Sequence, residues 1–163
     1  MTAIGGHERP NKGATDVWLT PLKIIENLGP FDLDPCGEAH WPTAKNIFTE
    51  RGLESPWFGR VWLNPPYSDV ERWLEKLSQH GRGIALVFAR TETRWAQRFM
   101  PLATSVFFPS GRFKFHHPDG SVPKWTAGAP SMFLAFGERP KWNLLGWEAI
   151  KQSKSLDAAM GKK

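Results

Sequence analysis

The chain has 163 residues and one cysteine, and its 21 Lys and Arg against 16 Asp and Glu give a formal net charge of +5. This length suits one domain with a single core, no apolar run reaches the roughly 18 residues that a membrane span needs, and a lone Cys36 excludes an internal disulfide and a cysteine cage for zinc. The positive charge favours a polyanionic partner such as nucleic acid, although many small basic proteins bind none.

The two ends of the chain differ in composition from the middle. Residues 1–15 are polar and glycine-rich and lack the charged and then apolar pattern of a secretory signal. Residues 151–163 are polar and basic. We expect flexible segments at both ends of a domain over 16–150, and a cytoplasmic protein.

Short apolar runs alternate with helix-like segments between these ends. The predicted elements, in chain order, are a helix from Leu22 to Leu28, strands over 31–34 and 61–63, a helix from Ser68 or Asp69 to about Gln79, a strand over 83–89, a short helix over 92–100, and strands over 106–108 and 131–136. Strands that alternate with helices favour an α/β fold around a mostly parallel sheet. Ligands bind beyond the carboxyl ends of the strands in such sheets.

The motif Asn64-Pro65-Pro66-Tyr67 directly follows one of the predicted strands. Two prolines remove two backbone donors and hold the preceding residue extended, which gives a rigid turn whose carbonyl groups are free to accept hydrogen bonds. The Asn64 side chain and the Pro65 carbonyl are suited to accept from an exocyclic amino group and to stabilise the positive charge that develops when its nitrogen attacks. The Tyr67 ring can stack on a base rotated out of a duplex. The alternative is an ordinary proline-rich turn.

Further segments around this motif carry a resemblance, in consistent order, over residues 16–137. They are Trp18–Pro21, Phe31–Cys36, Phe48–Thr49, Gly52–Leu53, Trp57 and Gly59–Ser68, with a weaker likeness at Arg90–Trp95 and Gly111–Phe115. Together they resemble the phage-type DNA N6-adenine methyltransferases. The resemblance implies a compact Rossmann-like methyltransferase fold, S-adenosylmethionine as the methyl donor, adenine N6 in DNA as the acceptor, and a bacterial or phage-infected host cell.

The resemblance also implies which residues bind the cofactor. The segment that lines the methionine end of the cofactor is matched by Trp18 and Thr20-Pro21, and the first cofactor loop is matched by Asp34-Pro35-Cys36, where an acidic group can hold the cationic amino group. Asp32 is a second acidic candidate, and Thr49 completes the predicted set. The alternatives are purely structural roles, in which Thr20 caps a helix and Asp34 ends a strand. Cys36 fits a packed small residue better than a nucleophile.

Three features of the sequence depart from the usual methyltransferase pattern. The first cofactor loop contains one glycine, Gly37, rather than several. Only Glu50 and Glu54 are candidates for the acidic residue that grips the ribose hydroxyls. The chain from Cys36 to Asn64 is short for the usual intervening strands and helices, so we expect the fold to be abbreviated there.

The basic residues suggest where DNA is bound. In Arg112–His117 cations alternate with aromatics, so an extended chain would place Phe113 and Phe115 on one side and Arg112 and Lys114 on the other. This pattern fits a DNA-binding surface or an ordinary half-buried strand. The predicted DNA contacts are Ser68, Arg94, Arg112 and Lys114.

Three neighbouring features have two interpretations each. The arginines Arg90, Arg94 and Arg98 recur at four-residue spacing, which fits a phosphate-tracking stripe or a solvated helical face. The Pro- and Gly-rich connection over 116–130 either contacts DNA bases or only joins two elements. The adjacent histidines at 116 and 117 lack partners, so we expect no metal site.

The predicted function is transfer of a methyl group from S-adenosylmethionine to adenine N6 in DNA. The same turn would also serve methylation of cytosine N4, of RNA bases or of a protein glutamine amide. A third possibility is a non-catalytic nucleic-acid-binding module that keeps the fold, because function depends on the site rather than on the fold.

Overall fold

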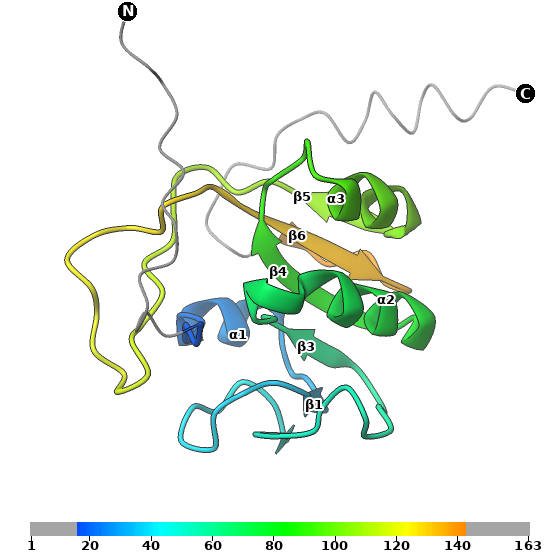
Figure 1. Ribbon diagram of the computed structural model, residues 1–163. Coiled ribbons are helices and arrows are strands. Elements are labelled where there is room, and N and C mark those ends of the chain that lie inside the picture. The colour runs from blue at the N-terminus through cyan, green and yellow to red at the C-terminus, as the bar shows by residue number, and fades with distance from the viewer. Residues whose placement is uncertain (1–15, 143–163) are drawn as a thin grey trace, which may run out of the picture.

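The computed structural model describes residues 16–142 (Figure 1). The segments predicted to be flexible, 1–15 and 151–163, and the predicted domain residues 143–150 lie outside the described residues. A six-stranded sheet with the order β2-β1-β3-β4-β6-β5 forms the centre of the described part. Its strands are β1 (Leu33–Asp34), β2 (Asn46–Ile47), β3 (Val61–Leu63), β4 (Gly83–Phe88), β5 (Ser105–Phe107) and β6 (Ser131–Phe136).

The sheet is mixed but mostly parallel. β1 pairs in parallel with β2 and β3, and β3 pairs in parallel with β4. β6 is antiparallel to both of its neighbours, β4 and β5. Five strands therefore run in one direction and β6 runs against them, which confirms the predicted α/β class with a mostly parallel sheet.

Helices cover both faces of the sheet and create two apolar cores (Figure 1). The helices are α1 (Leu22–Leu28), α2 (Val70–His80) and α3 (Arg94–Phe99), with 3-10 turns η1 (Tyr67–Asp69) and η2 (Met100–Leu102). Because side chains alternate along a strand, Ile84 and Leu86 of β4 pack in the core beside α1. Ala85 and Val87 pack in the core beside α2 and α3. The sheet is thus buried on both faces.

The segment between β1 and β3, where the sequence predicted an abbreviated fold, is short of regular structure. Residues 35–60 contain the two-residue strand β2 and no helix. β2 was not predicted, because Asn46 is exposed and Ile47 is only half-buried, so the segment has no apolar run. Its backbone nevertheless bonds to β1, since Asn46 N–H and Phe48 N–H donate to the carbonyls of Asp32 and Asp34.

The structure corrects one predicted helix boundary and excludes one of the two interpretations of residues 112–115, that of an ordinary half-buried strand. α3 begins after Thr93, whose hydroxyl accepts from the Ala96 N–H and so caps the helix. Phe113 and Phe115 do pack in the core beside α1, but residues 112–115 form no strand. The nearest pairing is an isolated antiparallel bridge between Leu19 and His116.

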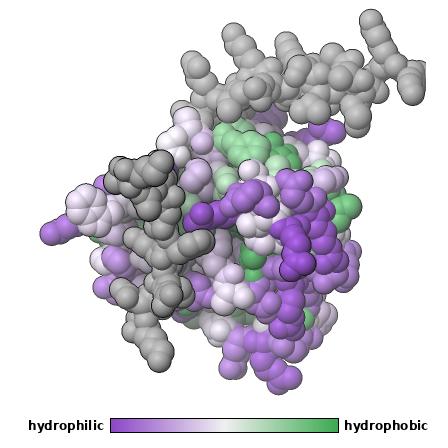
Figure 2. Space-filling view, turned by 45° about the horizontal axis from the view of Figure 1, so that its top comes forward, coloured by the Kyte–Doolittle hydropathy of each residue, from purple (hydrophilic) through white to green (hydrophobic). Residues whose placement is uncertain are grey.

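The surface seen in Figure 2 is largely hydrophilic, which agrees with the burial of most large apolar side chains in the two cores. Within residues 16–142, no helix has the length and apolar character needed to cross a membrane. A few large apolar side chains are exposed there, and they are Val17, Trp18, Phe58, Leu102, Phe108, Val122 and Trp125.

Candidate active site

Three parallel strands bring the predicted motifs to one edge of the sheet. β1 ends at Asp34, β3 ends immediately before Asn64, and β4 ends before Arg90. Because these strands pair in parallel, their carboxyl ends lie together. β6 runs the other way, so its first residue, Ser131, pairs with Phe88 at the same edge. The connection that precedes β6 therefore reaches this edge as well.

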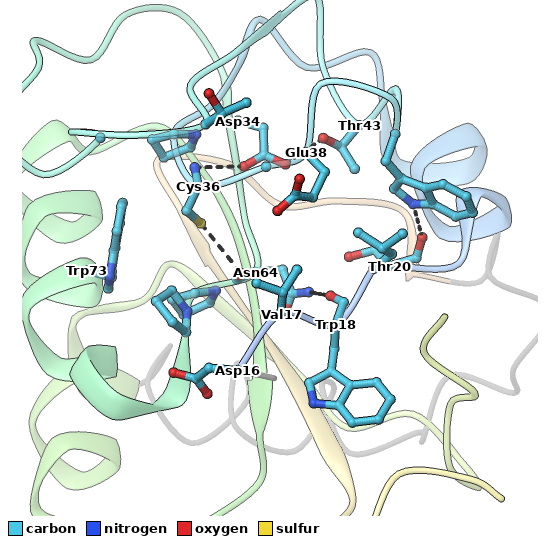
Figure 3. A pocket seen from close by; sticks show the side chains of 18 of the residues that line it. Asp16, Val17, Trp18, Thr20, Asp34, Cys36, Glu38, Thr43, Asn64 and Trp73 are labelled. Atoms are coloured by element: carbon cyan, nitrogen blue, oxygen red, sulfur yellow. Dashed lines mark hydrogen bonds between the residues drawn. The ribbon is translucent and has the colours of Figure 1, made fainter. Parts of the chain in front are cut away.

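A first cavity of about 250 Å³ opens at this edge (Figure 3). Its lining comes from residues 16–20, 34–38, Trp41, Thr43, 49–52, 64–67 and Trp73. Four carboxylates, those of Asp16, Asp34, Glu38 and Glu50, belong to this lining, against one guanidinium, that of Arg51. The excess of carboxylates suits a ligand that carries positive charge.

Asp34 is the most enclosed of these carboxylates, with 3% of its surface exposed. One oxygen accepts from the Cys36 N–H at 3.1 Å and the other accepts from the Thr43 hydroxyl. Burial raises the pKa of Asp34 to about 6, and the bonds from Thr43 and Cys36 act against that shift. The same loop cannot carry a side chain at Gly37, because a Cβ there would lie 2.7 Å from a carboxylate oxygen of Asp34. The single loop glycine is thus required by close packing.

Thr20 is buried, with 2% of its surface exposed, and its hydroxyl makes no hydrogen bond. α1 is capped at Pro21 without any side-chain bond, so the alternative of Thr20 as the helix cap is wrong. The Thr20 carbonyl accepts from the Trp41 indole at 2.7 Å. Figure 3 shows the hydroxyl on the opposite side, pointing toward the cavity. A buried hydroxyl without a partner costs free energy, so this group is available to bond with a polar ligand in the cavity.

Asn64 lies between the two loops that contain Asp34 and Thr20 (Figure 3). Its side-chain nitrogen donates to the Trp18 carbonyl at 2.7 Å. This bond fixes the amide, so the side-chain oxygen faces away from Trp18 and is presented as an acceptor. The backbone carbonyl of Asn64 accepts from the Cys36 thiol at 3.4 Å. Burial raises the pKa of Cys36 well above its usual value, which fits the predicted packing role rather than a nucleophile.

A second cavity of about 890 Å³ shares Trp18, Asn64 and Tyr67 with the first. The remainder of its lining is Phe88, Arg90, Phe115, His117 and residues 123–129. This lining contains two cations, Arg90 and Lys124, and no carboxylate. The two cavities therefore differ in charge and meet at the Asn64–Tyr67 turn.

The Tyr67 ring is stacked on Phe88, with ring centroids 4.1 Å apart and planes at 10°. One face of the ring is thus already covered, which narrows the predicted stacking on a base to the other face. The hydroxyl is buried without a hydrogen bond, and burial raises the pKa of Tyr67. The phenol stays neutral at physiological pH and is unsuited to act as a base.

The family model described as DNA N-6-adenine-methyltransferase (Dam) matches residues 8–153. The chain belongs to this family. One curated relative, the DNA N-6-adenine-methyltransferase of Escherichia phage T1, is 29% identical over 92 residues, which are 49% of this chain and 39% of the relative. The chain thus matches well under two thirds of that relative's length. No solved structure matches the chain.

For this member of the Dam family, most of the predicted cofactor residues come together. Trp18, Thr20, Asp34–Cys36 and Thr49 all line the first cavity with the Asn64–Tyr67 turn. Pro21 and Asp32 do not. The Asp32 carboxylate lies at the opposite end of β1, where it accepts from the Arg60 N–H and the Lys45 ammonium. Asp32 is therefore left out of the proposed site.

The predicted DNA contacts are more scattered. Ser68, Arg94, Arg112 and Lys114 line neither cavity. The Ser68 hydroxyl donates to Asp16 at 2.7 Å, whereas Arg112 donates to the carbonyls of Ala127 and Gly128, which line the second cavity. Arg94 and Lys114 are exposed. These assignments stay predictions.

The three arginines at four-residue spacing, Arg90, Arg94 and Arg98, have different surroundings in the structure. Arg90 lines the second cavity. Arg98 is paired with Glu71 at 3.2 Å and Glu75 at 2.7 Å, both on α2. The pairing of Arg98 with two carboxylates favours the interpretation of a solvated helical face over continuous phosphate tracking along the three arginines.

Sequence reasoning missed several lining residues. Glu38, Trp41 and Thr43 lie in a segment without periodicity, and no pattern in the sequence marks them. Phe88 was placed inside a strand, and only its position at the carboxyl end of β4 could have indicated a role in the site. Within the described part of the chain, no group of three or more His, Cys, Asp or Glu is placed to hold a metal ion.

Proposed function

We propose that the chain transfers a methyl group from S-adenosylmethionine to the exocyclic N6 of adenine in DNA, on an abbreviated Rossmann-like methyltransferase fold. The observation that carries this proposal is the meeting of two oppositely charged cavities at Asn64 and Tyr67. A cationic donor suits the first cavity, and a base attached to a phosphate backbone suits the second.

The residues of the first cavity fit the proposed cofactor. S-adenosylmethionine, when bound, supplies a methyl group on a positively charged sulfur. The carboxylate of Asp34 would attract the cationic amino group, and the unpartnered hydroxyl of Thr20 would bond to a polar group of the cofactor. Of the two acidic candidates for the ribose hydroxyls, Glu50 lines the cavity and Glu54 does not. Glu50 is therefore assigned to the ribose.

The turn at the junction would orient the acceptor. The side-chain oxygen of Asn64, held in place by the bond to Trp18, and the carbonyl of Pro65 accept from the two hydrogens of the adenine amino group. These acceptors direct the nitrogen lone pair toward the first cavity and stabilise the charge that develops on nitrogen during attack. The rings of Tyr67, Phe88 and Phe115 provide apolar walls for the base.

The test incubates the purified protein with tritiated S-adenosylmethionine and a mixture of unmethylated duplex DNA, RNA and protein. The DNA is then digested to nucleosides and separated by chromatography. Label in N6-methyl-2′-deoxyadenosine is the expected result. Label in N4-methyl-2′-deoxycytidine, or only in RNA or protein, would show that the acceptor is cytosine, RNA or protein instead of adenine in DNA. Binding of DNA without binding of the cofactor would show that the protein is a non-catalytic module.

A further inference from the structure

Trp125 has the most exposed large apolar side chain among residues 16–142, with 82% of its surface in solvent. The next in order are Val122 at 59% and Leu102 at 57%. A single exposed apolar residue needs no explanation by itself. Trp125, however, also lines the second cavity, so it stands at the mouth through which the proposed substrate enters.

The connection that contains Trp125 is held at both ends. On one side, His116 and Leu19 exchange two backbone hydrogen bonds of 2.9 Å, and the His40 side chain bonds to the Pro118 carbonyl at 2.8 Å. On the other side, the Ala127 N–H donates to the Phe113 carbonyl at 2.9 Å. Figure 1 shows the yellow connection projecting beyond the sheet between these anchors. Its tip is thus presented outward from a fixed base.

The charges beside the tip favour a polyanion. Lys124 precedes Trp125, and Arg90 lines the same cavity. The connection over 116–130 contains one carboxylate, that of Asp119, and this group accepts two hydrogen bonds from Ser121. Cations next to an exposed indole are the combination that contacts phosphates and bases together.

Other aromatic rings already line the second cavity and can hold the flipped base, so Trp125 is not needed for that purpose. Phe115 is buried there, and Tyr67 and Phe88 form a stacked pair. A base held against these rings leaves a gap in the duplex from which it came. Loss of its stacking and pairing costs a few kcal/mol, and an aromatic ring that stacks on the neighbouring bases offsets part of that cost.

We infer that Trp125 inserts into the DNA duplex at the position vacated by the target adenine, with Lys124 on the adjacent phosphate. This inference rests on the proposed function, since it requires an adenine that leaves the duplex. Trp125 then holds the opened duplex and does not touch the reacting nitrogen.

The experiment compares kcat/KM for two forms of one duplex that the protein methylates. In the first form the target adenine pairs with thymine, and in the second it faces an abasic site, so that it is already unpaired. The enzymes are the unaltered chain, Trp125→Ala, Trp125→Phe and a control, Phe58→Ala, whose exposed ring lines neither cavity.

We expect Trp125→Ala to lower kcat/KM on the paired duplex by about 10- to 100-fold, with a much smaller loss on the abasic duplex. Trp125→Phe should restore most of the activity, and Phe58→Ala should behave as the unaltered chain. An equal loss on both duplexes would place Trp125 on the target base itself, and no loss on the paired duplex would remove it from the interface; either result overturns the inference. If the unaltered chain labels no adenine in either duplex, the proposed function itself fails.

Discussion

The side-chain nitrogen of Asn64 donates a hydrogen bond of 2.7 Å to the carbonyl oxygen of Trp18. The next residue, Leu19, exchanges two backbone hydrogen bonds with His116. Segment 16–20 therefore joins the turn after β3 to the connection that precedes β6. Both cavities include Trp18 and Asn64 in their lining, so this bond forms part of the wall that they share.

Asn64→Ala should reduce methyl transfer by about 100-fold or more, because it removes an acceptor that stabilises developing charge. Affinity for S-adenosylmethionine should change little, since the first cavity keeps its carboxylates. The measurements are single-turnover label transfer and isothermal titration with the cofactor. Asn27→Ala is the matched control, because the Asn27 side chain donates to the Lys23 carbonyl within α1 and lines neither cavity. Near-normal transfer by Asn64→Ala would exclude the proposed role of the turn.

Thr20→Val should weaken cofactor binding without destabilising the protein. The Thr20 hydroxyl is buried without a partner, so its replacement by a methyl group of similar size should leave the free energy of unfolding equal or higher. Ser131→Ala is the control, because Ser131 also has a buried, unpartnered hydroxyl but lines neither cavity. Thermal melting and cofactor titration check both variants. Equal cofactor affinity in the two would show that Thr20 makes no bond to the ligand.

Asp34 should make stability and cofactor affinity respond to pH in opposite directions. Its pKa is raised by burial from 3.8 to about 6 in the folded protein, so the folded state binds the proton more tightly than the unfolded state. The contribution of Asp34 to stability therefore falls as pH rises from about 4 to 6, by at most about 3 kcal/mol for a shift of roughly two pKa units. Cofactor affinity should rise over the same range, because the carboxylate becomes charged.

Asp34→Asn tests that assignment. The variant should be more stable than the unaltered chain at pH 8, since it removes a buried charge, and it should lose the rise in cofactor affinity near pH 6. Denaturant melts and cofactor titrations at pH 5 and pH 8 provide the comparison. An unchanged pH profile of affinity in Asp34→Asn would assign the cationic amino group to another carboxylate.

Arg90→Ala and Arg98→Ala should differ in their effect on DNA binding. Arg90 lines the second cavity, whereas Arg98 is already paired with Glu71 and Glu75. We expect Arg90→Ala to weaken DNA binding and to lower the slope of log affinity against log salt by about one. Arg98→Ala should leave that slope unchanged. Fluorescence anisotropy over a salt series measures both, and equal slopes in the two variants would remove Arg90 from the DNA interface.

Arg60→Ala should lower the free energy of unfolding, although Arg60 takes no part in the proposed methyl transfer. The guanidinium makes bonds of 2.6–2.9 Å to Glu138 and also donates to the carbonyls of Leu28 and Pro30. The Arg60 and Glu138 side chains are only 17% and 20% exposed, so loss of one partner should cost about 2–4 kcal/mol. Lys23→Ala, which removes the exposed pair with Glu26, should cost less than about 1 kcal/mol. Chemical denaturation of both variants gives the comparison.

The strands were predicted best where the apolar run is uninterrupted. β3 and β6 have the predicted bounds, and β4 ends one residue earlier than predicted. Each is buried on both faces, so apolar composition alone identifies it. Residues 112–115 instead alternate cations with aromatics, and they form no strand. Alternation determines which side chains are buried, whereas a strand also needs a neighbouring backbone in register.

The sequence by itself determined the rigid Asn64–Tyr67 turn and its place at the carboxyl edge of the sheet, because proline restricts the backbone locally and parallel strands end together. Only the tertiary structure decided which of the two aspartates at β1, Asp32 or Asp34, faces the first cavity. Asp32 and Asp34 have the same parity on β1, but two residues along a strand move a side chain by nearly 7 Å, so one lies at the cavity and the other beside Arg60. The separation of charge between the cavities likewise depends on residues far apart in the chain, which the fold brings together through backbone pairing and burial.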